Sequence, residues 1–137
     1  MADAFQAVAS TSNLSADRPT LKPATLLRVF IGELARHHSL PLYEAIVLKA
    51  REMHLAGATV LRGPLGFGHT SRLHTMKILR LSEDLPVVIE IVDEPEKIDA
   101  FLPVLDGMIT GGLVTLEQVQ ILYHGSAETL SKAASAG

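Results

Sequence analysis

The chain of 137 residues contains no cysteine and no tryptophan. Without cysteine it has no disulfide framework, no thiolate metal ligands and no thiol nucleophile, which favours a cytoplasmic protein. Four Phe and two Tyr leave little material for a surface that stacks bases. The formal net charge is -3, and the 12 Lys and Arg residues are spread along the chain. We therefore expect no nucleic-acid partner.

Long apolar runs are also missing. No uninterrupted stretch approaches the ~18 residues of a membrane span. The first residues lack the basic start and the apolar block that are typical of a signal peptide. Both absences again favour the cytoplasm as the location.

The composition that remains is that of a folded protein. Apolar residues make up 47% of the chain and charged residues 20%, which predicts a compact core with surface left over for partners. Residues 1–23 and 126–137 are rich in Ala, Ser and Thr and have no sustained period, so we expect flexible tails there. Residues 24–125 would then form one domain of roughly 100 residues.

Hydrophobic periodicity within this domain predicts the order β-α-β-β-α-β. Strands are expected at 25–32, 58–62, 85–92 and 113–123. The first helix is expected to open at Ser39-Leu40-Pro41 and to end at Gly57. For the second helix we expect a cap at Asp93, entry through Pro95 and a stop at Gly111-Gly112.

This order is that of the ferredoxin-like fold in the α+β class, a four-stranded antiparallel sheet with two helices on one face. The first and third strands are expected in the middle of the sheet. Side chains alternate across a strand, so the helix side should receive Leu27, Val29, Ile31, Val87, Ile89 and Ile91. The opposite face should receive Arg28, Phe30, Val88, Glu90 and Val92. Because that face is too apolar to be left to water, we expect an obligate oligomer that covers it.

Arg28 and Glu90 place one cation and one anion on adjacent strands of the same face. Two interpretations remain open for them. They can form an ion pair on the covered face, or they can bind a ligand at a boundary between subunits.

Residues 63–70 (GPLGFGHT) put Gly63, Gly66 and Gly68 between two strand-like runs. Glycine reaches positive φ at little cost, and consecutive N–H groups in such a turn can cradle an anion. The alternative is a plain structural turn, since the spacing matches neither the dinucleotide fingerprint nor the P-loop. A polar group follows that suits either an anion or a solvated loop tip: Ser71, Arg72, His74, Thr75 and Lys77.

Signals for a metal or for catalysis are weak. Of the six histidines, His37 and His38 are adjacent and are expected to point apart, and no pair has helical metal-ligand spacing. No serine sits in a nucleophile elbow, and the acidic Glu94, Glu96 and Asp99 are explained by the dipole of the second helix. We therefore predict no catalytic residues, no metal site and no enzymatic activity.

Three motifs together resemble the PII signalling superfamily, and most closely its uncharacterised relatives known as domain of unknown function number 190. The motifs are RGPLGFG, LHTMKILRLSEDLPVVIEIVDEPEKI and ITGGLVTLEQVQILYHG, within residues 24–125. The resemblance implies a homotrimer that holds AMP, ADP or ATP in clefts between subunits. It also implies that residues 63–76 dock on a partner such as a membrane transporter or channel, fluoride exporters included.

The resemblance also implies roles for individual residues. Gly63, Gly66, Phe67, Gly68 and His69 match the base of the ligand-binding loop. Glu90 and Val92 match the strand that lines the adenine, next to Arg28. Gly111 and Gly112 match the turn after the second helix, which either simply ends that helix or meets the loop of a neighbouring subunit.

The chain departs from the PII pattern at three places. The turn after the second helix is only Gly-Gly, Ile121 and Tyr123 replace the two arginines of the last strand, and the loop has no tyrosine to be uridylylated. Fewer cations predict that AMP or ADP binds at least as well as ATP. The alternative function is a trimer of the CutA type that binds a divalent metal, for which His69, His74 and His124 would have to converge.

Overall fold

The structure is a computed structural model, and it describes residues 21–68, 73–75, 84–122 and 125. Residues Pro23–Gln120 form a compact unit, and the fold is described for that unit. Its helices are α2 (Leu42–Glu52) and α3 (Pro95–Met108). Its strands are β1 (Lys22–Gly32), β2 (Arg36–His37), β3 (Leu40–Pro41), β4 (Thr59–Arg62), β5 (Leu65–Gly66), β6 (His74–Thr75), β7 (Pro86–Asp93) and β8 (Leu113–Ile121).

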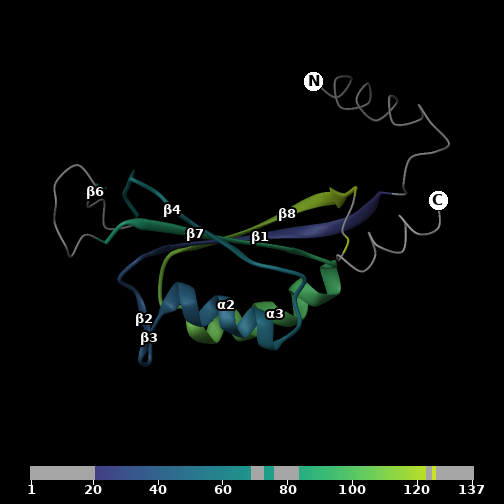
Figure 1. Cartoon of the computed structure of the whole chain (residues 1–137), viewed down its shortest axis with the longest axis horizontal. Helices are drawn as coiled ribbons and strands as arrows, with labels where there is room; N and C mark the ends of the chain where they lie inside the picture. The colour runs from purple at the N-terminus through teal and green to yellow at the C-terminus, as the bar shows by residue number, and fades with distance from the viewer. Residues whose placement is uncertain (1–20, 69–72, 76–83, 123–124, 126–137) are drawn as a thin grey trace, which may run out of the picture. The chain divides into compact units, whose positions relative to one another are not determined.

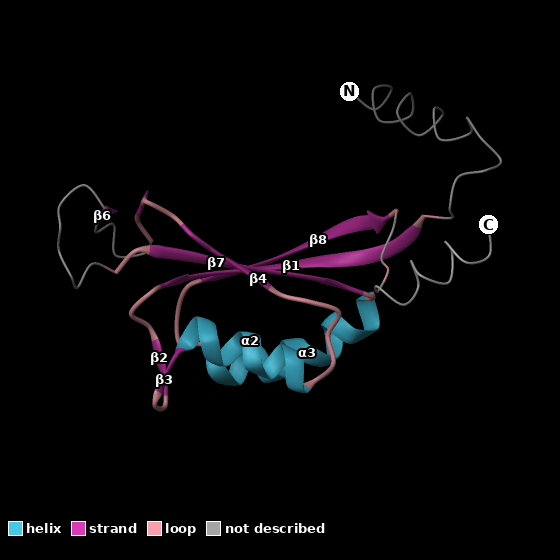
Figure 2. Cartoon of the chain, in the orientation of Figure 1, coloured by secondary structure: helices cyan, strands magenta, loops and turns pink. Residues whose placement is uncertain are grey.

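The main sheet has the strand order β4-β7-β1-β8. β7 runs antiparallel to both β1 and β4, with Arg28 opposite Glu90 and Thr59 opposite Glu90 on its other side. Both helices lie on one face of this sheet (Figure 1; Figure 2). The predicted ferredoxin-like arrangement, with the first and third predicted strands in the middle, is confirmed.

The core lies between the sheet and the two helices. Leu27, Val29 and Ile89 are fully buried, and the other predicted inward residues of β1 and β7 are nearly so. The helices contribute Ile46, Ile98, Phe101 and Leu105 to the same cluster. Each fully buried side chain of this kind stabilises the fold by about 1.5–3 kcal/mol, so this face alone accounts for much of the driving force for folding.

Helix α2 begins and ends differently from the prediction. Pro41 is the N-cap, one residue outside the helix. The helix ends at Glu52, and the left-handed residue that turns the chain away is His54, with φ of 60°. The amide of His54 donates to the carbonyl of Arg51 and that of Leu55 to the carbonyl of Ala50, which is a Schellman ending. The expectation that Gly57 ends this helix is therefore wrong.

Helix α3 begins at Pro95, as predicted, because proline has no amide hydrogen to leave unpaired in a first turn. Asp93 is not its cap, since the N-cap is Glu94 and no side chain caps the helix. The carboxylate of Asp93 is instead buried, where it accepts hydrogen bonds from the amides of Ala56 and Glu94. Neither α2 nor α3, nor any other helix among the described residues, is long and apolar enough to span a membrane.

Two small ladders lie outside the main sheet. β2 and β3 form a hairpin in which His37 pairs with Leu40, and it leads directly into α2 (Figure 1). Its tight turn places His38 at φ of 54°. β5 and β6 pair Leu65 with Thr75 and Gly66 with His74. The sequence predicted neither ladder, because two-residue strands carry no periodic signal.

Candidate functional site

The two glycine segments that the sequence singled out lie at the same end of the main sheet. Gly63 follows β4, and its amide donates to the carbonyl of Pro86 at the start of β7, with N···O 2.7 Å. Gly112 precedes β8 and lies against the carbonyl of Phe30, near the end of β1. β4 and β8 are the two opposite edges of the sheet. One chain therefore brings both segments to one end but keeps two strands between them.

Gly63 and Gly66 pack against the ring of Pro86. A Cβ at either position would stand 2.9 Å from the Pro86 Cγ, which is closer than real Cβ atoms come. Gly112 is the only described glycine with positive φ, so Gly63, Gly66 and Gly68 do not use the left-handed region. The first two are needed for close approach, and residues 63–68 contain no turn with positive φ. At Gly68 a Cβ would meet nothing within 4 Å.

Steric contact with β1 explains why the Gly111-Gly112 turn requires a glycine. Gly112 has φ of 100°, and a Cβ there would overlap the carbonyl oxygen of Phe30. At Gly111 a Cβ would meet nothing within 4 Å. Helix α3 has already ended at Met108. The turn is therefore a place where β8 is brought against β1 rather than a simple helix stop.

Both ends of the long connection from β4 to β7 are fixed to the segment that follows β1. Arg62 forms an ion pair with Glu33. On the far side, the Asp84 carboxylate accepts the amide of Leu34 at 2.8 Å, and the amide of Glu33 donates to the carbonyl of Leu85 at 2.8 Å. One ion pair and two hydrogen bonds therefore fix both ends of the loop to the segment that follows β1.

Arg28 lies at the centre of the sheet face that the helices leave open. Its Nε donates to Oε2 of Glu90 at 3.0 Å, and its Nη1 donates to Oε2 of Glu117 at 3.1 Å. The side chains of Arg28 and Glu90 are 38% and 29% exposed, so the pair is only partly shielded from water. The predicted ion pair between Arg28 and Glu90 is present within one chain. Glu117 completes the network, and only its place in an alternating strand could have indicated this.

The same contacts set the electrostatics of Arg28. The hydrogen bond to Glu90, and then the charges of Glu90 and Glu117, raise the pKa of the Arg28 guanidinium. Arg28 therefore stays charged at any physiological pH. With two carboxylates around one guanidinium, the centre of this face carries a net negative charge.

The remaining predicted residues of the site divide into exposed and undescribed ones. Phe67 is 69% exposed. Val92 is 36% exposed and lies on the same face of the sheet as Glu90. His69 lies outside the described residues, as do Ser71, Arg72 and Lys77. Only the backbone of His74 and Thr75 is described, in β6.

The histidines give no metal centre in the described part of the chain. His37 and His38 do not point apart as predicted, since their rings meet edge to face with centroids 4.4 Å apart. The left-handed backbone of His38 brings the two rings together. Among the described residues no group of three His, Cys, Asp or Glu side chains could hold a metal ion. His69 and His124, needed for the CutA-type site, lie outside those residues.

Comparison with known protein structures supports the same fold. The described unit resembles a PII-like signalling protein from Thermus thermophilus, with a TM-score of 0.57, 17% identity, and coverage of 76% of this chain and 94% of the other. CPII, a nitrogen regulatory PII-like protein from Thiomonas intermedia bound to ADP, AMP and bicarbonate, gives a TM-score of 0.53 at 17% identity and covers 76% and 92%. CutA1 from Oryza sativa gives 0.50 at 11% identity and covers 86% and 96%.

Two proteins found by sequence comparison share a higher identity with this chain than these structures do. A protein of Aquifex aeolicus named UPF0166 is 42% identical over 98 residues, which cover 72% of this chain and 92% of that protein. A UPF0166 protein of Methanocaldococcus jannaschii is 32% identical over 103 residues, with 74% and 94% covered. The family DUF190, described as "Uncharacterized ACR", matches residues 24–121. With its PII-like fold and these relatives, the chain belongs to the DUF190 family.

Proposed function

We propose that this protein is a non-enzymatic, cytoplasmic sensor of the PII type, which binds an adenine nucleotide or a similar small anion at clefts between the subunits of a homotrimer. One observation carries the proposal. The segments Gly63–Gly68 and Gly111–Gly112 lie at one end of the sheet but on opposite edges, so a site built from both requires a second copy of the chain. CPII, which has this fold, was crystallised with ADP and AMP.

The open face of the sheet supports association with further copies of the chain. Leu61, Val88 and Phe30 form an apolar row across three strands, and Leu61 is 50% exposed. Beside this row lies the charged row of Glu90, Arg28 and Glu117. A second copy of the same sheet offers both an apolar surface and charges of both signs, so it suits this face.

Charge near the glycine segments favours a nucleotide with few phosphates. Arg62 is already paired with Glu33, and Arg28 is shared between Glu90 and Glu117. Among the described residues near these segments, both arginines are therefore already paired, so each added phosphate charge would lack a free cation there. We therefore expect AMP or ADP to bind at least as tightly as ATP, with micromolar or weaker affinity.

The output of the sensor would be the loop over residues 63–76. Ligand contacts at its base would select one loop conformation, and that conformation would bind or release a partner, with a membrane transporter or channel as the first to test. The described stem is already paired through β5 and β6, so the switch would act on residues beyond Gly66.

Titration calorimetry with AMP, ADP and ATP tests the proposal on the full chain. Gly68→Ala adds a methyl group where the structure has room, so a loss of binding would report on the ligand rather than on folding. Gly107→Ala in α3 makes the same change at an equally open position and should bind like the wild type. ATP tighter than ADP by more than about tenfold would contradict the charge argument.

A null calorimetric result would separate the candidates further. If no nucleotide gives heat while a divalent metal raises the melting temperature, the CutA-type function replaces this proposal. If Gly68→Ala binds nucleotide as the wild type does, Gly68 takes no part in binding, and the proposed role of the loop base is wrong at this position.

A further inference from the structure

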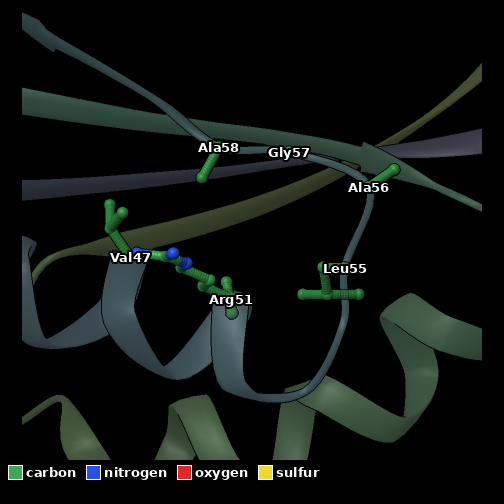
Figure 3. Close-up of a pocket in the computed structure, with 7 residues that line it drawn as sticks. Val47, Arg51, Leu55, Ala56, Gly57 and Ala58 are labelled. Carbon is green, nitrogen blue, oxygen red and sulfur yellow. The ribbon is translucent and has the colours of Figure 1, made fainter. Parts of the chain in front are cut away.

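A cavity of about 310 Å³ lies between α2 and the segment that connects it to β4. Its walls include Val47 and Ala50 on the helix and Leu55, Gly57 and Ala58 on the connection. It is distinct from the glycine segments, of which Gly63–Gly68 follows the other end of β4 and Gly111–Gly112 precedes β8. Figure 3 shows Ala58 pointing down toward the helix and Leu55 closing one side.

The cavity exists because small residues face each other across it. Ala50 on α2 and Gly57 and Ala58 on the connection are too small to fill the space between the two segments, and the side chain of Ala56 points away from the helix (Figure 3). Ala56 and Gly57 are exposed, so the cavity is open to water on the side of the connection and is not a gap within the core. A volume near 300 Å³ is at the lower end of the range for small-molecule sites.

The walls are fixed rather than free to collapse. The amide of Leu55 donates to the carbonyl of Ala50 at 3.0 Å, which ties the start of the connection to the helix. The amide of Ala56 donates to Oδ2 of Asp93 at 2.9 Å, and Asp93 is only 5% exposed. The buried carboxylate therefore holds the connection away from α2, and the cavity is preformed.

Arg51 supplies the one charge that lines this cavity. Its side chain runs along α2 so that the guanidinium lies beside Val47 (Figure 3). Among the described residues it has no carboxylate partner, and the neighbouring Glu52 is paired with Lys49 at 3.1 Å. An apolar cavity with one free guanidinium suits a ligand that has an apolar body and one anionic group.

The structure assigns this cavity as a binding site for a small organic carboxylate, with its apolar body between α2 and Ala58 and its carboxylate on Arg51. The volume of 310 Å³ holds about ten non-hydrogen atoms, taking about 30 Å³ for each water-sized group. A dianion such as a phosphate monoester fits less well. The amides of Leu55 and Ala56 are already bonded, and the carbonyl end of α2 repels added negative charge.

Phenylacetate and 2-phenylethanol are the probes that test this assignment. They have similar size and shape, and only the first carries a charge. Backbone amide shifts of Gly57 and Ala58 in the full-length protein report occupancy. We expect saturable shifts with phenylacetate at millimolar concentration or below, and binding of 2-phenylethanol that is at least about tenfold weaker.

Three variants make the result specific. Arg51→Met keeps an unbranched apolar chain on an exposed position, and it should reduce phenylacetate affinity about tenfold without changing that of 2-phenylethanol. Ala58→Leu should abolish binding of both by filling the cavity. Arg36→Met removes a guanidinium that bonds the carbonyl of Ser39 in the β2–β3 hairpin, and it should change neither affinity.

Several outcomes would overturn the assignment. These are the absence of saturable shifts at about 10 mM phenylacetate, equal binding by Arg51→Met, or tighter binding of phenyl phosphate than of phenylacetate. Because the site does not use the glycine segments or a second subunit, failure of nucleotide binding would leave this inference unaffected.

Discussion

The two faces of the central strands are built from alternate residues of the same segments, yet their surroundings differ. On the helix side Val29 and Ile89 are completely buried by α2 and α3. On the open side their neighbours Phe30 and Val88 are only half-buried. One chain therefore completes its core on one face alone. The difference indicates that the helix face is responsible for folding, and that the open face is available for association.

The polar and charged residues of the sheet also differ between its two faces. Arg28, Glu90 and Glu117 all lie on the open face, where water or another subunit can solvate them. On the helix side the buried polar residue is Asp93, and both of its carboxylate oxygens accept backbone amides. Polar groups on the helix side must be satisfied within the chain, whereas those on the open face can also be satisfied by a partner.

The largest expected effect on stability comes from truncating a core side chain on the helix side of the sheet. Phe101 in α3 is fully buried, so Phe101→Ala should lower the free energy of unfolding by about 3–5 kcal/mol through lost contacts and a cavity. Phe67→Ala is the control, because Phe67 is 69% exposed and its removal should leave stability almost unchanged. Urea denaturation followed by circular dichroism measures both. A loss below about 1 kcal/mol for Phe101→Ala would mean that α3 does not anchor the core.

A charge on the open face should act on assembly instead. Phe30→Asp would place an unpaired carboxylate in the apolar row of the open face, so we expect the proposed trimer to dissociate or the protein to precipitate. Light scattering gives the mass at micromolar concentration, and circular dichroism shows whether the chain remains folded. The comparison of faces fails if the wild type itself is a monomer, or if Phe30→Asp assembles normally.

Gly112 affects both faces, because it lies against β1 at the start of the edge strand β8. Gly112→Ala should destabilise the protein by about 2 kcal/mol, since alanine disfavours φ of 100° and its methyl group would meet the carbonyl of Phe30. Gly111→Ala adds the same methyl group in open space and should be close to neutral. Thermal unfolding of the two variants side by side makes the measurement. Equal melting temperatures would show that the turn relaxes at little cost.

The smallest expected effect concerns the charged network. Glu90→Gln should lower the urea midpoint slightly, and Glu117→Gln should lower it less, because the Glu117 side chain is 60% exposed and that of Glu90 is 29% exposed. Salt should reduce both differences. A raised pKa means that the contribution of Arg28 is complete below its ordinary pKa and is lost only as the pH rises through the folded value. No pH dependence from Arg28 is expected between about pH 5 and pH 9, and a transition there would have to come from another group.

Strong periodicity made most of the fold predictable. The inward and outward residues of β1 and β7 were predicted correctly, because burial on one face requires apolar residues at alternate positions of a strand. Proline at the start of α3 was also correct, since its preference is local. The residues at which the helices end were less predictable. His54 rather than Gly57 turns the chain after α2, because the Schellman bonds hold a non-glycine residue at positive φ.

The candidate site was only partly predictable for a related reason. The sequence indicated that Gly63, Gly66 and Gly112 need the absence of a side chain. It did not show that the first two lie against Pro86 and the third against Phe30. Glu117 and the anchors Glu33 and Asp84 were missed, because each acts through a contact with a residue that is distant in the sequence.

The amino-acid sequence by itself determined the element order, the helix-covered face of the sheet and the family, since all three depend on local patterns of residue type. Only the tertiary structure decided which glycines are spacers, which carboxylates share Arg28, and that Asp93 holds open a cavity beside α2. Periodicity assigns a side chain to a face, whereas steric fit and hydrogen bonding depend on which distant residue is opposite it. That opposite residue is determined only when the chain folds.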